Sequence, residues 1–241
     1  MIPDAAELVA APVSARRLHE DILGAWSTPH FGLDYSPLRR FASNKMYSER
    51  RPGFAPELLS EPQILVATDL MLATKTDCDS QVAFIPGSDG LCAGVLAWIR
   101  IRLGDAWLGT GPLDPDVHWT PQFLPVDPPI NARAGETLSF NLHRPAHGEW
   151  TWRLATGGET RRHSTFLSQP RSLSDMRKLA PDFVGKRNDR ALAVQDVLGR
   201  MDGTMRSAAI ATHLMQTYPR QFSDAAAALA FVREMARKYA Q

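Results

Sequence analysis

Hydrophobic positions near the N-terminus follow a helical spacing. Residues 5–26 mix apolar residues with helix formers, and within 14–26 three apolar residues recur at intervals of four, which predicts a short amphipathic helix. Gly32 and Pro37 interrupt the pattern that follows. We interpret residues 14–50 as a helical excursion, either a hairpin of helices packed on its own domain or a protruding arm.

A period of two replaces the helical spacing after Pro62. β-branched or alternating runs bounded by Gly, Asp and Pro predict antiparallel strands. The predicted strands are 62–72, 81–87, 90–103, 106–111, 136–144, 149–156 and 161–167. Tight turns are expected at 87–90, Gly135-Glu136, His147-Gly148 and Gly157-Gly158. The pattern predicts a mainly β fold with helical additions, closed as an antiparallel β-barrel or packed as a sandwich.

The run 90–103 shows the alternation most clearly. One face carries Val95, Ala97, Ile99 and Ile101, and the other carries Leu96, Trp98, Arg100 and Arg102. We expect the first face to be buried and the second to be partly exposed to solvent.

Helical spacing returns after Pro170, where the last predicted strand ends. The predicted helices are 174–180, 189–201, 205–218 and 223–239, with Ser223 as the cap of the last one. Their predicted core is Leu192, Val197, Leu198, Ile210, Leu214, Phe222, Leu229, Phe231 and Met235. The chain is therefore expected to form two domains, 1–170 and 171–241, the second one small, all-α and winged-helix-like.

Composition narrows the class of protein only slightly. The 241 residues are 44% hydrophobic and 22% charged, which is ordinary for a soluble globular protein, and a net charge of +1 argues against a surface devoted to nucleic acid. Cys78 and Cys92 lie in no metal-ligand or disulfide pattern. No signal peptide or membrane span is predicted, so we expect a cytoplasmic protein with no membrane partner and no bound metal.

Motifs for nucleotide-like cofactors are missing. A class I methyltransferase needs a strand, a glycine-rich turn and a helix, whereas here residues 87–90 are expected to form a hairpin turn and residues 109–111 lead into Pro112. Phosphate-binding loops and nucleophile elbows are absent as well. The sequence therefore predicts that this chain alone binds no such cofactor.

Residues 107–145 resemble the β-barrel domain of the protein arginine methyltransferases. The matching residues are Gly109-Thr110-Gly111-Pro112, Pro115, Val117-His118-Trp119, Gln122-Phe123 and Ala134-Gly135-Glu136. Three further stretches are similar to family motifs: the Trp98 strand, residues 31–38, which resemble the helical dimerisation arm, and Ile2-Pro3-Asp4, which follows the cofactor domain in the family. The resemblance spans about residues 2–167.

The resemblance implies the substrate-cleft and dimerisation half of an S-adenosylmethionine-dependent arginine N-methyltransferase. By position, His118 would pair with a carboxylate of the cofactor domain and Trp119 would line the substrate arginine channel, both in supporting roles. Val117 and Pro121 replace the family's Thr and Lys, which puts fine loop geometry in doubt. The implied partners are a Rossmann-type methyltransferase domain or subunit, a second copy bound through the arm, and a protein or peptide substrate. Methyl transfer would need that domain, because the paired glutamates and the cofactor site belong to it.

Other interpretations of the same residues remain open. His118 and Trp119 could belong to a loop that only plugs one end of the barrel. Trp150 and Trp152 are expected to be simple packing residues, and His143, His147 and His163 receive no role.

The C-terminal helices have a second, weaker likeness. Residues 191–239 are similar in rhythm to small peptide-chaperone domains of the pyrroloquinoline quinone type, through Asp202-Gly203 and Ile210-Ala211. The alternative function is therefore a non-catalytic module that binds a peptide or another partner through these helices. A helix-turn-helix would instead bind DNA. From Arg171 onward there are twelve Lys and Arg against seven Asp and Glu, but they are scattered, so we expect no nucleic-acid partner.

Overall fold

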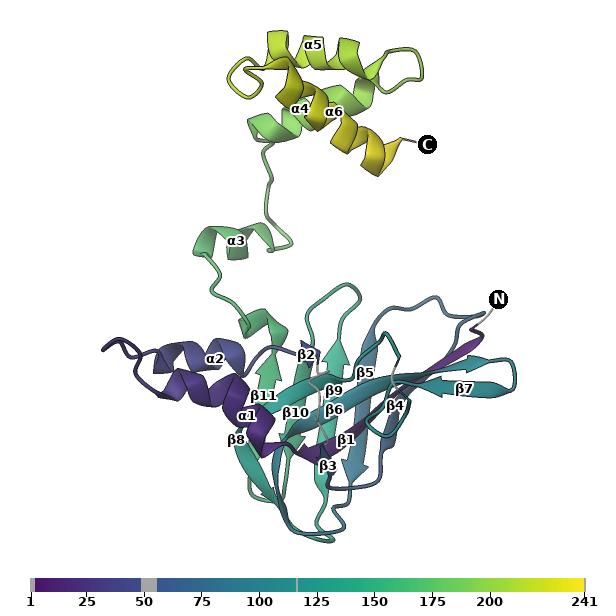
Figure 1. Cartoon of the computed structure of the whole chain (residues 1–241), viewed down its shortest axis with the longest axis vertical. Helices are drawn as coiled ribbons and strands as arrows, with labels where there is room; N and C mark the ends of the chain where they lie inside the picture. The colour runs from purple at the N-terminus through teal and green to yellow at the C-terminus, as the bar shows by residue number, and fades with distance from the viewer. Residues whose placement is uncertain (1–2, 49–55, 116, 241) are drawn as a thin grey trace. The chain divides into compact units, whose positions relative to one another are not determined.

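The chain divides into two compact units, Met1–Pro170 and Arg171–Gln241, each with its own hydrophobic core. The computed structural model describes residues 3–48, 56–115 and 117–240 (Figure 1). The first unit is mainly antiparallel β-sheet with a helical excursion, and the second is helical. The predicted fold class is therefore confirmed. No helix in the described residues is long and apolar enough to cross a membrane.

The larger sheet of the first unit contains strands from its whole length. Its members within the described residues are β1 (Ala5–Ser14), β2 (Tyr47–Ser48), β3 (Glu57–Leu58), β4 (Gln63–Asp69), β6 (Gly90–Leu103), β7 (Ala106–Gly109) and β8 (Gln122–Ala132). The strand order is β2-β8-β6-β1-β3, with β4 also paired to β1 and β7 to β6.

A smaller sheet packs against the larger one. It consists of β5 (Cys78–Phe84), β9 (Leu138–Arg144), β10 (Thr151–Ala155) and β11 (Thr160–Ser164) in the order β11-β10-β9-β5. The main core lies between the sheets and includes Phe84, Leu124, Phe140 and Trp152. The strands that the structure describes pair as two sheets and not as one closed barrel, which corrects that part of the prediction.

The turn at residues 87–90 is also different from the prediction. It joins β5 to β6, but β5 pairs with β9 and β6 pairs with β1, β7 and β8. The turn therefore connects the two sheets and does not close a hairpin.

Strand β1 is the main element that the sequence pattern missed. Its alanines and glutamate favour a helix, yet the segment runs antiparallel to β6 from Ala5↔Arg102 to Val13↔Gly94 and also pairs with β4 and β3. Ladder hydrogen bonds on both edges outweigh a small local helix preference. Its small residues let both faces pack closely, and residues 9–13 are buried.

Both faces of β6 are buried over residues 92–98, although the alternation itself is as predicted. Val95 and Ala97 enter the core between the sheets, whereas Leu96 and Trp98 enter a second core under the helix α1 (Arg16–Leu23). The predicted solvent-facing side of β6 is therefore wrong for Leu96 and Trp98, because the helical excursion covers them.

The helical excursion begins with α1, which confirms the predicted amphipathic helix. It continues through the 3-10 turns η1 (Gly24–Ser27) and η2 (Ser36–Leu38) to α2 (Arg39–Ala42). Its tip is a tight turn closed by the bridge between His30 and Leu33. The predicted excursion ends at Glu49 and Arg50, which lie outside the described residues, as does Ile2.

Gly94 marks the closest approach of β6 to β8. A Cβ atom at this position would lie 2.4 Å from Cε2 of Phe123 and 2.6 Å from the carbonyl oxygen of Leu124. Gly94→Ala is therefore expected to destabilise the first unit by roughly 1–3 kcal/mol, because backbone and a fully buried ring must move. Urea unfolding checks this value, and Gly157→Ala, where nothing lies within 4 Å of the new Cβ, is the control. Equal stability of the two variants would contradict the packing described here.

The helical unit consists of α3 (Leu173–Lys178), α4 (Asp189–Arg200), α5 (Ser207–Thr217) and α6 (Ala225–Tyr239). Asp224, and not Ser223, caps α6 by accepting a hydrogen bond from the backbone N–H of Ala227. Two predicted core residues are wrong, because Leu192 and Leu198 are 37% and 38% exposed. Val197 is buried on α4 as predicted, and Ala193, which was not predicted, is buried beside it.

Candidate functional site

The two candidate residues His118 and Trp119 lie in the loop between β7 and β8. Both are exposed, Trp119 to 50%, and both line a cavity of about 540 Å³ in the first unit. The open interpretation that Trp119 is a buried plug at one end of the fold does not match this exposure.

The cavity draws its lining from both sheets. The lining residues are Leu8, Met46, Ala97, Trp98, Ile99, His118, Trp119, Thr120, Gln122, Leu142 and Trp150. Three of them are tryptophans, and none of the described lining residues is Asp, Glu, Lys or Arg. The site is therefore an aromatic and aliphatic hollow with a few neutral polar groups at its wall.

A glycine-rich turn holds the start of this loop against β6. Thr110 Oγ1 accepts a hydrogen bond from Ile99 N–H at 3.2 Å, and Gly111 N–H donates to Asp114 Oδ2 at 2.8 Å. A Cβ atom at Gly111 would lie 2.7 Å from Trp98 Nε1. A larger residue would thus push the loop away from Trp98, so the glycine is needed for this approach.

The neighbouring tryptophans have different surroundings. Trp152 is buried in the core and donates its Nε1–H to the carbonyl oxygen of Pro125 at 2.8 Å, so its predicted packing role is confirmed. Trp150 is partly buried, packs against the same core and also lines the cavity. The guanidinium carbon of Arg144 lies 5.2 Å from the centroid of the Trp150 ring, which is a cation–π distance.

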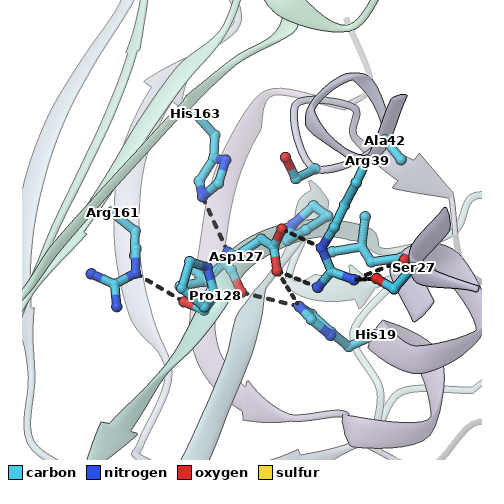
Figure 2. A network of polar contacts seen from close by, with 12 residues as sticks. His19, Ser27, Arg39, Ala42, Asp127, Pro128, Arg161 and His163 are labelled. Atoms are coloured by element: carbon cyan, nitrogen blue, oxygen red, sulfur yellow. Dashed lines mark hydrogen bonds and ion pairs between the residues drawn. The ribbon is translucent and has the colours of Figure 1, made fainter. Parts of the chain in front are cut away.

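A separate polar network joins the helical excursion to the large sheet (Figure 2). Arg39 Nε and Nη2 donate to the two carboxylate oxygens of Asp127 at 2.9 and 2.6 Å. Arg39 Nη1 also donates to the carbonyl oxygen of Leu23 and to Ser27 Oγ. The hydrogen bonds to Asp127 raise the pKa of Arg39. The side chain of Asp127 is 12% exposed, so this bidentate pair is largely shielded from water.

Two histidines complete this network from either side of Asp127. Nε2 of His19 on α1 lies 3.6 Å from Asp127 Oδ1, and Nε2 of His163 on β11 accepts the backbone N–H of Asp127 at 3.3 Å. Burial lowers the pKa of His19, and it lowers the pKa of His163 to about 4. Both histidines are therefore neutral near pH 7. The network anchors the helical excursion to the large sheet, and none of its residues is among the described lining residues of the cavity.

Sequence reasoning missed the network. It assigned His163 no role and did not connect Arg39 with Asp127, which lie 88 positions apart in the chain. The one local signal is a lone carboxylate in the otherwise apolar run of β8, where a charge requires a partner. Of the other histidines, His143 is exposed near Asp79 and His147 occupies a turn with a φ of 57°.

Neither cysteine is suited to act as a nucleophile. Burial raises the pKa of Cys92 to about 12 and also raises the pKa of Cys78. The described part of the chain contains no group of three or more His, Cys, Asp or Glu side chains placed to bind a metal ion.

The helical unit contains one polar cluster of its own. Asp196 Oδ1 accepts a hydrogen bond from Arg200 Nε at 2.8 Å, and its Oδ2 lies 2.7 Å from His213 Nε2. The cluster ties α4 to α5, and its charges are satisfied by one another. Asp196 and Arg200 also line a cavity of about 520 Å³ in this unit.

Curated relatives of the chain are arginine methyltransferases. Protein arginine N-methyltransferase 2 of Xenopus tropicalis is 28% identical over 162 residues, 62% of this chain and 37% of that protein. Arginine N(omega)-methyltransferase of Streptomyces achromogenes is 28% identical over 144 residues, 59% of this chain and 39% of that protein. The chain spans less than half the length of these relatives and matches their C-terminal portion. No family model matches the chain.

A solved structure shares the fold. The enzyme–prozyme heterotetrameric complex of protein arginine methyltransferase 1 from Trypanosoma brucei, bound to S-adenosylhomocysteine, superposes with a TM-score of 0.59 at 15% sequence identity. The match covers 68% of this chain and 58% of that one. The comparisons thus consistently identify protein arginine N-methyltransferases as the family that this chain resembles.

Proposed function

We propose, from this resemblance to the protein arginine N-methyltransferases, that the chain supplies the substrate-cleft wall and the dimerisation arm of an enzyme that methylates arginine nitrogens. The observation that carries the proposal is the loop of His118 and Trp119, which lies at the wall of an open cavity. A loop of this kind can orient a guanidinium without reacting itself. The sulfonium donor is already activated, so catalysis in such a site depends on positioning and electrostatic support.

The described residues do not fit S-adenosylmethionine. Every strand pairing among them is antiparallel, and β1 passes to α1 through Ala15 with no glycine between them. A class I methyltransferase instead binds this donor at a glycine-rich turn that leads from a strand into a helix. We therefore place the donor site in a Rossmann-type domain or subunit that binds this chain.

Titration with S-adenosylmethionine tests whether the donor site lies outside this chain. Isothermal titration of this chain alone is expected to show no binding, because no strand in the described residues leads through a glycine-rich turn into a helix. Addition of the part of the Streptomyces relative that precedes the matched region is expected to give methyl transfer to an arginine peptide. Binding by the chain alone would contradict the proposal, as would a mixture that associates and binds the donor yet transfers nothing.

His118 and Trp119 are expected to act on this reaction by positioning. His118→Ala in the reconstituted enzyme is expected to lower kcat/KM by roughly 10- to 100-fold, the loss typical of a misplaced loop. His143→Ala, an exposed histidine on β9 outside the cavity lining, is the matched control. Unchanged kinetics of His118→Ala, with the cavity loop intact by NMR, would remove His118 from the site.

The helical excursion is expected to mediate dimerisation. Phe31 at its tip is fully exposed and adopts a φ of 52°. This backbone conformation is unfavourable for a bulky residue, so the turn exposes the ring at a cost in free energy. Phe31→Asn tolerates the same backbone and removes the ring. We expect the dimer dissociation constant of the enzyme to rise by roughly 30-fold or more, as for a truncated interface anchor.

Analytical ultracentrifugation measures this change. Leu72→Asn removes another exposed apolar side chain, in the loop after β4, and is expected to leave the dissociation constant unchanged. A monomer at high concentration, or equal effects of the two substitutions, would count against the assignment of the arm.

A further inference from the structure

A cavity of about 520 Å³ lies along one face of α4 in the helical unit. Its lining consists of Leu192, Gln195, Asp196, Gly199 and Arg200 on α4, and of Tyr218, the C-cap residue of α5. The α4 residues are spaced by three or four positions, so they form one stripe along the helix. Gly199 leaves the stripe open, because nothing lies within 4 Å of a Cβ atom built there.

The hydrogen-bond acceptors in the lining of this α4 cavity are already engaged. Asp196 Oδ1 accepts from Arg200 Nε at 2.8 Å, and Asp196 Oδ2 lies 2.7 Å from His213 Nε2. The side-chain oxygen of Gln195 accepts from Arg187 Nη1. Burial opposes the ionisation of Asp196, but its hydrogen bonds to His213 and Arg200 outweigh burial and lower its pKa. Asp196 is therefore ionised at neutral pH and fixes the position of Arg200.

The hydrogen-bond donors of the α4 cavity are available to a ligand. Among the described residues, Nη1 and Nη2 of Arg200, the amide nitrogen of Gln195 and the hydroxyl of Tyr218 have no hydrogen-bond partner. Arg200 binds Asp196 through Nε, so its two terminal nitrogens can still donate parallel hydrogen bonds to a planar carboxylate. A site with engaged acceptors and available donors fits an anion.

The surroundings of Arg200 indicate which anion fits. Its guanidinium lies beside the Asp196 carboxylate, which would repel a dianion such as phosphate more strongly than a monoanion. Leu192 is 37% exposed and lies eight positions before Arg200 on the same stripe, about 12 Å along the helix axis. An extended peptide covers that distance with about four residues. A carboxylate carried by an apolar peptide segment therefore matches both ends of the cavity.

We propose that the α4 cavity binds a short apolar peptide segment through a carboxylate. Arg200, Gln195 and Tyr218 donate hydrogen bonds to the carboxylate, while an apolar side chain of the segment packs on Leu192. The carboxylate is that of a peptide C-terminus or of an acidic side chain, because both present the same two oxygens. All residues of the site belong to the unit Arg171–Gln241, so the site is independent of the methyl-transfer role proposed for the first unit.

Titration of the full chain with tetrapeptides, followed by the NMR signals of the α4 backbone, tests the inference. The probes are acetyl-leucyl-alanyl-alanyl-leucine with a free C-terminus, the same peptide as its C-terminal amide, acetyl-leucyl-alanyl-alanyl-glutamic acid amide, and inorganic phosphate. At least one of the two peptides with a carboxylate is expected to bind tenfold or more tightly than the neutral amide, because hydrogen bonds to a charged group are the strong ones. The tighter of the two identifies the source of the carboxylate. Phosphate is expected to bind more weakly than that peptide.

Two variants separate binding from folding. Arg200→Lys keeps the charge beside Asp196 but loses the planar pair of donors, so binding of the tighter peptide is expected to weaken by about tenfold. Gly199→Leu places a good helix former in the open stripe. This variant is expected to keep the midpoint of urea unfolding and to weaken binding by at least tenfold, because the new side chain fills the cavity. Arg233→Gln, at an exposed position of α6 outside the lining, is the matched control.

Four results would overturn the inference: no binding at millimolar peptide, equal binding of the neutral amide, binding of phosphate as tight as that of the peptides, or unchanged binding in either variant. A loss of binding in Arg233→Gln as large as in Arg200→Lys would overturn it as well. Peptide binding without methyl transfer in the reconstituted enzyme would support this site and contradict the proposed function, and the reverse result would do the opposite.

Discussion

Replacing Asp127 by asparagine is expected to lower the free energy of unfolding of the first unit by about 2–4 kcal/mol. Breaking a buried ion pair by removing one partner typically costs about 3–5 kcal/mol, because the other charge is left uncompensated. Arg39 is 28% exposed and can regain part of its hydration, which places the expected cost toward the lower end. The lost contacts join α2 to β8, so the helical excursion should also lose its anchor.

Chemical denaturation of the single and double variants separates the pair from the rest of the network. The double variant Arg39→Met/Asp127→Asn is expected to lose less free energy of unfolding than the two single variants lose in sum. Each single variant leaves one charge without its partner, whereas the double variant contains neither charge. Asp4→Asn is the matched control, since Asp4 accepts a bidentate bond from Arg102 at 3.0 Å on the exposed surface. It is expected to change stability little. Equal losses for Asp127→Asn and Asp4→Asn would contradict the assigned role of burial.

Acidification is expected to destabilise the first unit through His163. Burial lowers its pKa to about 4 in the folded state, against about 6.5 when unfolded, so the unfolded chain binds the proton first as the pH falls. Stability is therefore retained above pH 6.5 and lost progressively between pH 6.5 and 4. By linkage the loss reaches about 2 kcal/mol at pH 5, where most carboxylates are still ionised.

The hydrogen bonding of His163 also predicts a loss of stability on acidification. Its Nε2 accepts the backbone N–H of Asp127, so the neutral ring carries its proton on Nδ1. A second proton on Nε2 would place two N–H donors, that of the ring and that of Asp127, against each other. Nδ1 is buried and has no hydrogen-bond partner among the described residues. The charged ring would therefore lose an existing bond and gain none.

His163→Gln keeps an acceptor for the Asp127 N–H and removes the titrating ring. Urea unfolding between pH 7.5 and 5 is expected to show a much smaller pH dependence in this variant. Some dependence should remain, because burial also lowers the pKa of His19. His143→Gln, an exposed site, is expected to behave as the unaltered chain does. A full pH dependence in His163→Gln would assign the acid sensitivity to other groups.

The strands of the first unit could largely be predicted because their residues alternate strictly. β6 was predicted over its whole length, and β4, β5, β7, β9, β10 and β11 all fall on or next to predicted runs. β1 was missed because alanine and glutamate favour a helix locally. Only pairing with β6, β4 and β3 makes the extended form more stable. No alternating run predicted β8, because its prolines hide the alternation along the strand.

The candidate loop could be identified from residue order, but its surroundings could not. Val117-His118-Trp119 was recognisable as a motif, whereas the cavity beside it depends on Leu8, Met46, Leu142 and Trp150, which approach one another only when two sheets pack. Residue spacing also says nothing about ion pairs between distant segments, which is why Arg39 and Asp127 were not connected.

The sequence by itself determined most of the strands after Pro62, the alternation along β6 and the family resemblance, because these depend on local periodicity and on short motifs. Tertiary structure alone decided that β1 is a central strand, that α1 covers the second face of β6, and that the sheets stay open to one another at a tryptophan-lined cavity. Those outcomes depend on contacts between residues far apart in the chain. The free energy of these contacts exceeds the local conformational preferences. Such contacts produce no pattern among neighbouring positions of the sequence.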